Sequence, residues 1–260
     1  MQPSDIPDAI RRAHAEWRCE LAYELVRSCA TFRLSHPSGA ARYVKIAQLD
    51  YRPSLADEAE RVRWAAQHLS VPEVLEAGRD DRVQWMLTNA LPGVDATNEH
   101  LRAEPERLVR LLARGLRQIH RAPTADCAFD FRLDRALAHV RRRIDSNELD
   151  SRGFNTEHRH LTPAEALAIL ERDRPQTEEV VLCHGDYCFP NILIEDWSIT
   201  GFVDLGELAL ADRWYDLAVG TWTTIWNLGP GWEETFLRAY GIEPDWTRIR
   251  YYRLLYDLAS

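Results

Sequence analysis

Lysine is almost missing from this chain: of its 32 lysine and arginine residues, only Lys45 is a lysine. Arginine occupies every other basic position, which indicates that this site needs a compact ammonium where a broad guanidinium would not fit. Lys45 lies in the short strand-like run Tyr43-Val44-Lys45-Ile46. The alternative is compositional drift that left one lysine here by chance.

The chain also lacks long apolar segments. No run approaches the roughly 20 apolar residues of a membrane-spanning helix, and residues 1–8 lack the apolar core of a signal peptide. We therefore expect a cytoplasmic protein that binds no membrane. Its net charge of -9 disfavours nucleic acid as a partner and suits a small cationic substrate.

Paired cysteine spacings of the kind that bind metals are missing too. The cysteines are odd in number, namely Cys19, Cys29, Cys127, Cys183 and Cys188, and we expect free thiols. The sequence shows no internal repeat and no low-complexity segment. With 260 residues, 45% of them hydrophobic, it can bury a large core in one domain or two lobes, as a monomer or a homodimer.

Side chains suited to phosphoryl transfer follow one another in the second half of the chain. Asp186 belongs to His184-Gly185-Asp186, Asn191 follows it, and Asp204 comes later in Val203-Asp204-Leu205-Gly206. Phosphoryl transfer requires a carboxylate that orients the attacking hydroxyl, and oxygen ligands for the magnesium that neutralises the triphosphate. The order of these residues is that of a kinase. Each residue alone is equally consistent with an ordinary turn or a strand end.

A hairpin is predicted between the last two of these side chains. Apolar or β-branched runs at 192–195 and 198–203 flank Asp196-Trp197, a pattern typical of a tight turn between two strands. The hairpin would return the chain so that Asn191 and Asp204 meet at its open end and share one hard cation. Magnesium is therefore the expected metal.

Kinases place a lysine on a strand over the phosphates and pair it with a glutamate on the following helix. Lys45 fits the first role, and Glu58 is the best candidate for the second, with Glu60 behind it. The sequence therefore contains two kinase features, far apart in the chain, that agree with each other.

The pattern of apolar residues changes along the chain. Strand-like runs at 19–26, 30–34, 41–47 and 83–87 surround a predicted helix at 55–69, whereas helical periodicity dominates after Pro105. We expect an α+β protein with a small β-rich nucleotide-binding lobe at 1–90 and a larger, mainly helical catalytic and substrate-binding lobe at 91–260. Leu91-Pro92-Gly93 is the predicted hinge, the hairpin belongs to the second lobe, and Thr162-Pro163-Ala164-Glu165 is a predicted capping box.

Taken together, these motifs carry a family resemblance. The chain resembles the aminoglycoside phosphotransferases, most closely the 3'-phosphotransferase branch, through Val44-Lys45-Ile46, Leu91-Pro92-Gly93, the cluster at 184–216 and Tyr251-Tyr252-Arg253-Leu254-Leu255. The resemblance covers nearly the whole chain. It implies a two-lobed protein-kinase-like fold and transfer of the γ-phosphoryl group of ATP, with Mg²⁺, to an aminoglycoside hydroxyl.

The resemblance also implies a role for each matching residue. Asp186 would be the catalytic base, Asn191 and Asp204 the magnesium ligands, Lys45 the phosphate-binding lysine, Glu58 its partner, Asn89 and Ala90 the backbone contacts of adenine, and Asp216 a buried carboxylate that steadies the catalytic loop.

The chain departs from this family in the residues expected to bind the phosphates of ATP and in those expected to bind the aminoglycoside. Its phosphate loop, Leu25 to Phe32, contains no glycine, which leaves the hydroxyl and amide of Ser28 as phosphate contacts. The C-terminus keeps Asp257 of an acidic pair found in relatives. Asp150 and Glu157, in the segment 145–157, are further candidates to bind the ammonium groups of an aminoglycoside.

These observations predict an ATP-dependent O-phosphotransferase that acts on an aminoglycoside and confers resistance to it. A kinase for another small hydroxylated metabolite or antibiotic is the second hypothesis. The third is a pseudokinase that binds nucleotide without catalysis, which the missing loop glycine favours and the complete set of catalytic groups disfavours.

Overall fold

A computed structural model describes residues 1–25 and 28–260 of the chain. The chain forms two compact units, each described by itself below. The first unit contains Met1–Val94 and Leu193–Glu207, and the second contains Asp95–Ile192 and Leu208–Ser260. The hairpin segment therefore packs with the N-terminal unit, which differs from the expectation that it belongs to the helical lobe. The functional division expected at residue 90 stays a prediction.

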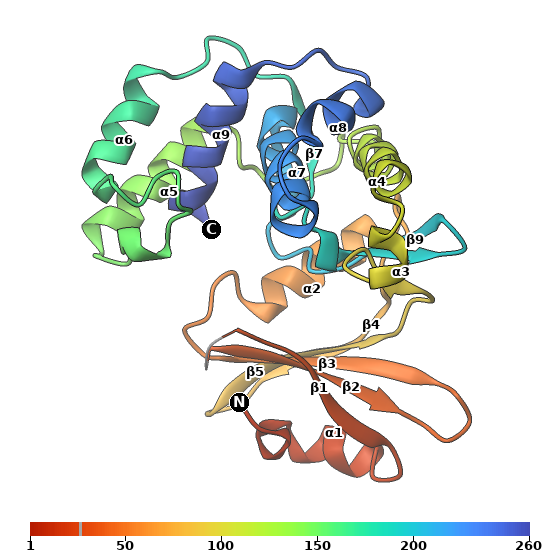
Figure 1. Cartoon of the computed structure of the whole chain (residues 1–260). Helices are drawn as coiled ribbons and strands as arrows, with labels where there is room; N and C mark the ends of the chain where they lie inside the picture. The colour runs from red at the N-terminus through yellow and green to blue at the C-terminus, as the bar shows by residue number, and fades with distance from the viewer. Residues whose placement is uncertain (26–27) are drawn as a thin grey trace. The chain divides into compact units, whose positions relative to one another are not determined.

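The described residues of the first unit form an antiparallel sheet with the strand order β1-β2-β3-β5-β4 (Figure 1). Its strands are β1 (Arg18–Leu25), β2 (Cys29–Ser35), β3 (Ala41–Gln48), β4 (Val74–Arg79) and β5 (Val83–Asn89). Sequence patterns predicted four of these strands to within two residues, although position 26 lies outside the described residues. The edge strand β4 was not predicted, because its sequence, VLEAGR, does not alternate apolar and polar residues.

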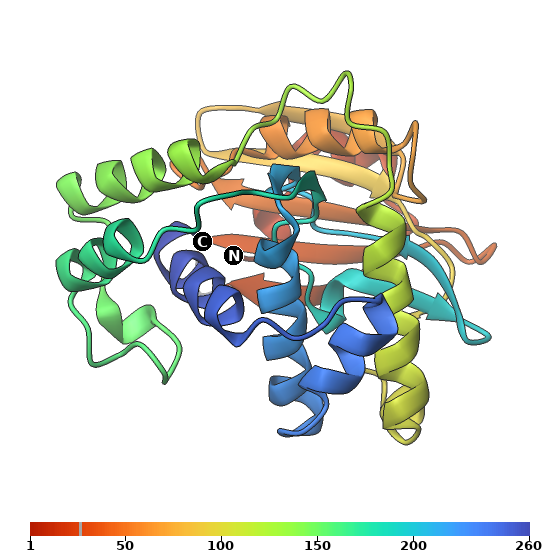
Figure 2. The same cartoon turned by 90° about the horizontal axis from the view of Figure 1, so that it is seen from above.

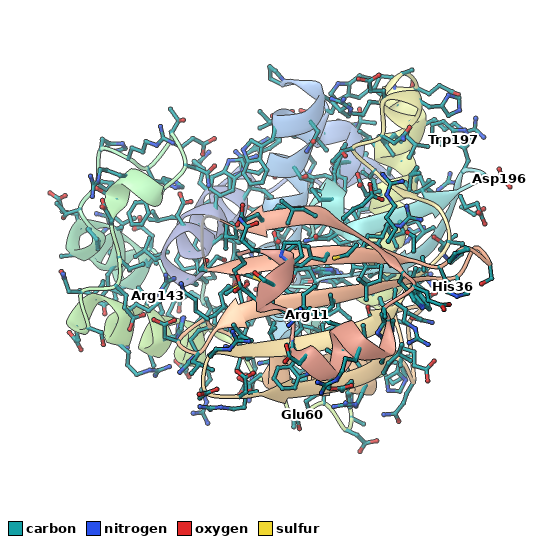
Figure 3. The ribbon with its side chains drawn as sticks, turned by 90° about the horizontal axis from the view of Figure 1, so that it is seen from below. Arg11, His36, Glu60, Arg143, Asp196 and Trp197 are labelled. Carbon is teal, nitrogen blue, oxygen red and sulfur yellow. The ribbon has the colours of Figure 1, made fainter. Side chains whose placement is uncertain are left out.

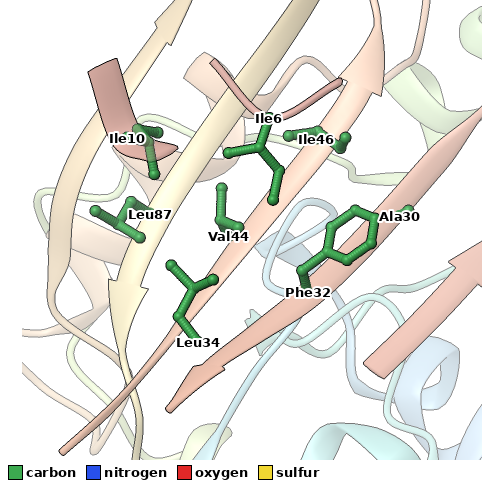
Figure 4. Close-up of a cluster of buried hydrophobic side chains, with 8 residues drawn as sticks. All are labelled: Ile6, Ile10, Ala30, Phe32, Leu34, Val44, Ile46 and Leu87. Atoms are coloured by element: carbon green, nitrogen blue, oxygen red, sulfur yellow. The ribbon is translucent and has the colours of Figure 1, made fainter. Parts of the chain in front are cut away.

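Helices lie on both faces of this sheet. Successive side chains of a strand point to opposite sides, so each strand contributes side chains to both faces. On one face, Ile6 and Ile10, the latter from α1 (Asp8–Ala13), pack against Phe32 and Val44 (Figure 4). On the other face, α2 (Leu55–Ala65) packs its apolar side against neighbouring residues of β2, β3 and β5. Lys45 belongs to this second face because Val44 and Ile46 belong to the first.

The predicted hairpin is confirmed as β8 (Ile192–Glu195) and β9 (Ser198–Phe202), beside the short β6 (Val94–Asp95). Asp196 and Trp197 form its tip, with φ angles of 49° and 57° (Figure 3). Positive φ at both central residues is typical of the tight turns that match the twist of a hairpin.

The second unit is mainly helical. Its helices are α3 (Glu99–Arg102), α4 (Pro105–Ile119), α5 (Leu133–Asp145), α6 (Pro163–Arg172), α7 (Arg213–Leu228), α8 (Glu233–Tyr240) and α9 (Trp246–Ala259), and β7 (Val180–Cys183) pairs with β10 (Ala209–Asp212). The short turns η1 (Pro3–Asp5), η2 (Ser151–Gly153) and η3 (Phe189–Asn191) complete the elements of the described chain. The α+β class is therefore confirmed.

Two groups of helices build this unit. Helices α4, α7 and α8 pack side by side, and α5 and α6 pack with each other and with α9 (Figures 1 and 2). The predicted capping box is confirmed at the start of α6, where Thr162 and Glu165 exchange hydrogen bonds. Within the described ranges, no helix is long and apolar enough to cross a membrane.

Candidate active site

Lys45 forms the centre of an ion cluster in the first unit. Its Nζ lies 2.8 Å from Oε2 of Glu58 and 2.8 Å from Oδ1 of Asp204. Burial alone would lower the pKa of Lys45, but the two carboxylates outweigh it and hold the pKa well above its usual value. The lysine therefore carries a fixed positive charge.

The local sequence explains how Glu58 reaches this lysine. Ser54 caps α2 and forms a capping box with Asp57, so that the first turn of the helix is fixed. Glu58 follows on the side of the helix that faces the sheet and is buried. Glu60, the weaker candidate, is exposed. Of the two glutamates proposed from the sequence, the structure brings Glu58 to Lys45.

Asp204 adopts a backbone conformation that is uncommon for a residue other than glycine. Its φ angle is 59°, and it follows β9 after a single intervening residue. Aspartate tolerates this left-handed region better than most residues, and such conformations often occur at functional sites. Asp204 keeps a half-exposed carboxylate, which Lys45 neutralises from one side.

A second cluster, in the helical unit, holds the loop that contains Asp186. Asp216 of α7 accepts hydrogen bonds from the backbone N–H groups of His184 at 2.7 Å and Gly185 at 2.9 Å. Its carboxylate also lies 3.1 Å from Nε2 of His120. Asp216 is fully buried, and these bonds hold the loop that contains Asp186; the catalytic role of this loop stays a prediction.

The carboxylate of Asp186 is held by donors from three side chains. Nδ2 of Asn191 donates to Oδ2 at 2.9 Å, while the thiol of Cys188 and the hydroxyl of Tyr256 both donate to Oδ1 at 2.9 Å. Sequence reasoning did not find Tyr256, because it lies in a helix far along the chain and no local spacing marks the contact. Asn191 also donates to the main-chain oxygen of Asp186, so its own side-chain oxygen points elsewhere.

The expected nucleotide contacts lie in the sheet unit, and several of their polar groups already have partners. The N–H and hydroxyl of Ser28 both donate to the main-chain oxygen of Leu25. The N–H groups of Asn89 and Ala90 donate to the main-chain oxygens of Glu73 and Ala41. The adenine contacts expected at these two residues stay a prediction. Val26 and Arg27, the middle of the expected phosphate loop, lie outside the described residues.

The three acids proposed to bind the acceptor all form hydrogen bonds or ion pairs with other side chains of the chain. Asp257 is nearly buried and binds Asn155 and His158. Glu157 and Asp150 are both about half exposed. Glu157 accepts hydrogen bonds from Trp222 and Arg253, and Asp150 pairs with Arg152, whose hydrogen bond lowers the pKa of that carboxyl. Direct contact of Asp257 with a substrate stays a prediction, and only 3% of its side chain is exposed.

Comparison with known proteins gives consistent matches over nearly the whole chain. The model of the phosphotransferase enzyme family matches residues 27–252. An aminoglycoside 3'-phosphotransferase from Streptomyces fradiae is 36% identical over 214 residues, which cover 77% of this chain and 78% of that protein.

Solved structures agree with this match. The crystal structure of an aminoglycoside 3'-phosphotransferase of type VIII superposes with a TM-score of 0.87 at 30% identity, covering 96% of each chain. Aminoglycoside phosphotransferase APH(3'')-Id from Streptomyces rimosus, in complex with ADP and streptomycin, superposes with a TM-score of 0.76 at 28% identity, again covering 96% of each chain. These likenesses confirm the expected protein-kinase-like fold.

Proposed function

We propose that this chain, which belongs to the aminoglycoside phosphotransferase family, transfers the γ-phosphoryl group of ATP to a hydroxyl group of an aminoglycoside, in the manner of the 3'-phosphotransferases, and so confers resistance to that antibiotic. The observation that carries the proposal is the carboxylate of Asp186, which three hydrogen bonds hold in place. It lies in the His184-Gly185-Asp186 motif, the segment expected to be the catalytic loop. A cytoplasmic location suits an enzyme that consumes ATP and is part of the proposal.

Asp186 is the proposed base. The oxygen of the acceptor hydroxyl forms a bond to the γ-phosphorus, the bond between that phosphorus and the β,γ-bridging oxygen breaks, and ADP leaves with the electron pair. The hydroxyl proton passes to the carboxylate of Asp186. Asn191 donates one hydrogen bond to this carboxylate through its Nδ2.

Lys45 is the proposed ligand of the α- and β-phosphates. Its ammonium is held between Glu58 and Asp204, so its position is set before nucleotide binds. Such preorganised charge stabilises the negative charge that develops in the transition state without the cost of reorganisation. Ser28, Asn89 and Ala90 are the proposed further contacts of the nucleotide.

Asn191 and Asp204 are the proposed magnesium ligands. Both residues supply oxygen, the ligand atom that Mg²⁺ prefers. The side-chain nitrogen of Asn191 donates hydrogen bonds to Asp186, so its side-chain oxygen is the proposed metal ligand. Asp204 presents a half-exposed carboxylate. Bound Mg²⁺ would neutralise charge on the phosphates and leave Asp186 as the proton acceptor.

A coupled ADP-release assay with MgATP and a panel of aminoglycosides tests this proposal. We expect turnover on kanamycin or neomycin that falls by about 1,000-fold or more in Asp186→Ala. The matched control is Asp196→Asn, at the exposed hairpin tip, which keeps a residue that tolerates positive φ and should retain full activity. Turnover that survives in Asp186→Ala would refute the role of Asp186.

A kinase for another hydroxylated metabolite or antibiotic is the second candidate. The engagement of Asp257 with Asn155 and His158 favours it, because a cationic drug would find one fewer free carboxylate. If Asp257 binds an aminoglycoside, Asp257→Ala raises the KM for the drug and leaves the KM for MgATP unchanged. An unchanged KM for the drug supports the second candidate.

The pseudokinase is the third candidate, and the glycine-free phosphate loop favours it. The donors of Ser28 are already used within that loop. Binding of MgATP without turnover of any acceptor in a broad panel would support this candidate over both kinase functions.

A further inference from the structure

Tyr256 reaches the proposed catalytic base from the last helix of the chain. Its hydroxyl, on α9, donates to Oδ1 of Asp186 over 2.9 Å. We propose that Tyr256 is a positioning residue that holds the Asp186 carboxylate in the orientation that receives the acceptor hydroxyl. The inference rests on the proposed function, in which Asp186 is the base.

The hydrogen bonds at Asp186 explain why Tyr256 matters. An ionised carboxylate offers about four lone-pair directions. Within the described ranges, Tyr256 and Cys188 donate to Oδ1, and Asn191 donates to Oδ2. One direction on Oδ2 therefore remains for the acceptor hydroxyl. Without Tyr256, Oδ1 keeps only the thiol of Cys188, which is a weak donor, and the carboxylate can rotate away from the acceptor.

The hydroxyl of Tyr256 is itself fixed by its surroundings. The neighbouring Asp257 is bound to Asn155 and His158, which anchors the end of α9. The ring of Tyr256 packs edge-on against Trp222 with a centroid distance of 6.2 Å. A catalytic group is held precisely when its supporting residues are locked by packing and by hydrogen bonds of their own. The ring of Tyr256 meets the first condition, and the hydrogen bonds of the adjacent Asp257 hold the turn of α9 that carries it.

Rotation of the base should affect the chemical step more than binding. The substrates bind through other groups, so the KM values need not change, whereas a small misplacement of the reacting groups slows the reaction. We expect Tyr256→Phe, which keeps the ring and removes the donor, to lower kcat about tenfold. The KM values for MgATP and for the aminoglycoside should stay within about twofold.

Tyr251→Phe is the matched control for this variant. Tyr251 lies on the same helix and is buried, and its hydroxyl has no hydrogen-bond partner among residues 1–25 and 28–260. Its removal should leave kcat and both KM values unchanged. A kcat of Tyr256→Phe equal to that of the wild type would overturn the proposal, as would an equal loss in both phenylalanine variants.

A double-mutant cycle with Asp186→Ala tests whether Tyr256 acts through the base. Residual phosphoryl transfer is measured with radiolabelled ATP in the wild type, the two single variants and the double variant. We expect Tyr256→Phe to cause no further loss once Asp186 is removed. The same proportional loss in both backgrounds would show that Tyr256 acts elsewhere.

The same four proteins provide a measurement that needs no acceptor. Tyr256→Phe should lower the midpoint of thermal unfolding in the wild-type background and have a smaller effect in the Asp186→Ala background. Absence of aminoglycoside turnover in the wild type would refute the proposed function alone. Equal shifts of the midpoint in both backgrounds would refute the coupling of Tyr256 to Asp186.

Discussion

The ammonium of Lys45 is held by two carboxylates at equal distances. Glu58 and Asp204 each lie 2.8 Å from its Nζ, and only 12% of the lysine side chain is exposed. Three charged groups in so small a space require a compact cation, because a guanidinium would push at least one carboxylate away. The single lysine in the chain therefore has a physical explanation in this cluster.

Lys45→Arg should impair the reaction severely although it preserves the charge. We expect kcat/KM for MgATP to fall about 100-fold, because the broader group disturbs Glu58 and Asp204 together. Steady-state kinetics measures the loss. Arg33→Lys, an exposed exchange on β2, is the control and should behave like the wild type. Full activity of Lys45→Arg would contradict the steric explanation.

The Cys29 thiol gives a prediction for alkaline pH. Burial raises the pKa of Cys29 to about 11, so the native protein keeps this thiol protonated at pH values where the unfolded chain has lost the proton. A raised pKa contributes stability that is complete below about pH 9 and is lost as the pH rises towards 11. The free energy of unfolding should therefore fall in this range, by up to about 3 kcal/mol from this group.

Urea unfolding between pH 8 and 11, in the wild type and in Cys29→Ala, measures this contribution. Other groups also titrate there, so the difference between the two pH slopes isolates the thiol. The alanine variant should lose less stability with rising pH. Parallel curves for the two proteins would contradict the prediction.

Short-range motifs explain which site residues the sequence could reveal. Asp186, Asn191 and Asp204 stand in fixed order within one segment, and Lys45 is marked by being the only lysine. Tyr256 carries no such mark, because its contact with Asp186 joins residues 70 positions apart. Such a contact depends on how α9 packs, which local patterns do not encode.

Gly93, which follows the last strand of the five-stranded sheet, occupies a position that only glycine can fill without strain. Its φ angle is 96°, and a Cβ at this position would lie 2.4 Å from the main-chain oxygen of Ile194 in β8. Both the backbone conformation and the close approach of the hairpin thus require glycine. The predicted interruption at Leu91-Pro92-Gly93 has this physical basis.

Gly93→Ala should destabilise the protein by about 2–4 kcal/mol, from backbone strain together with the clash. Gly39→Ala separates the two causes, because Gly39 has a similar φ of 93° and no heavy atom within 4 Å of an added Cβ. Urea unfolding should show a clearly smaller loss for Gly39→Ala. Equal losses would mean that the contact with Ile194 contributes nothing.

Helix boundaries were predictable where capping chemistry marks them. The first turn of α6 was found from Thr162 and Glu165, whose mutual hydrogen bonds form as expected. The helix at 55–69 was predicted too long, since α2 ends at Ala65 and its last turn tightens into i,i+3 bonds such as that from Gln67 to Trp64. No cap residue in the sequence marks this end.

Thr162→Ala should cost about 1 kcal/mol of stability through loss of the cap of α6. The hydroxyl of Thr162 accepts a hydrogen bond from the N–H of Glu165 and donates one to the carboxylate of the same residue. Thr162→Ser keeps the hydroxyl and should restore most of the stability in the same unfolding experiment. A serine variant as unstable as the alanine variant would contradict the capping role.

At the scale of the whole molecule, charge should favour a cationic acceptor. The net charge is -9, and a negative protein attracts an aminoglycoside over distances that salt shortens to about 10 Å at 0.1 M. We expect kcat/KM for kanamycin to fall about two- to fivefold between about 0.05 M and 0.5 M salt. An uncharged hydroxylated acceptor is the control and should show a weaker dependence. Equal salt dependence for both acceptors would contradict long-range attraction.

The division of the molecule was only partly accessible from the sequence. A change from alternating to helical periodicity after Pro105 indicated a β-rich part and a helical part, and both exist. The packing of Leu193–Glu207 with the N-terminal unit could not be predicted, because these residues directly follow Asp186 and Asn191 of the helical unit in the chain. Their partners, including Ser70 and Pro92, become neighbours only through the fold.

The most direct test of the central claim identifies the product. Kanamycin is incubated with MgATP and the enzyme, and the product is studied by two-dimensional ¹H–³¹P correlation NMR, with Asp186→Ala as the blank. The account predicts a new phosphomonoester whose phosphorus couples to the proton at the 3' carbon. Release of ADP with inorganic phosphate alone, and no phosphorylated kanamycin, would contradict it.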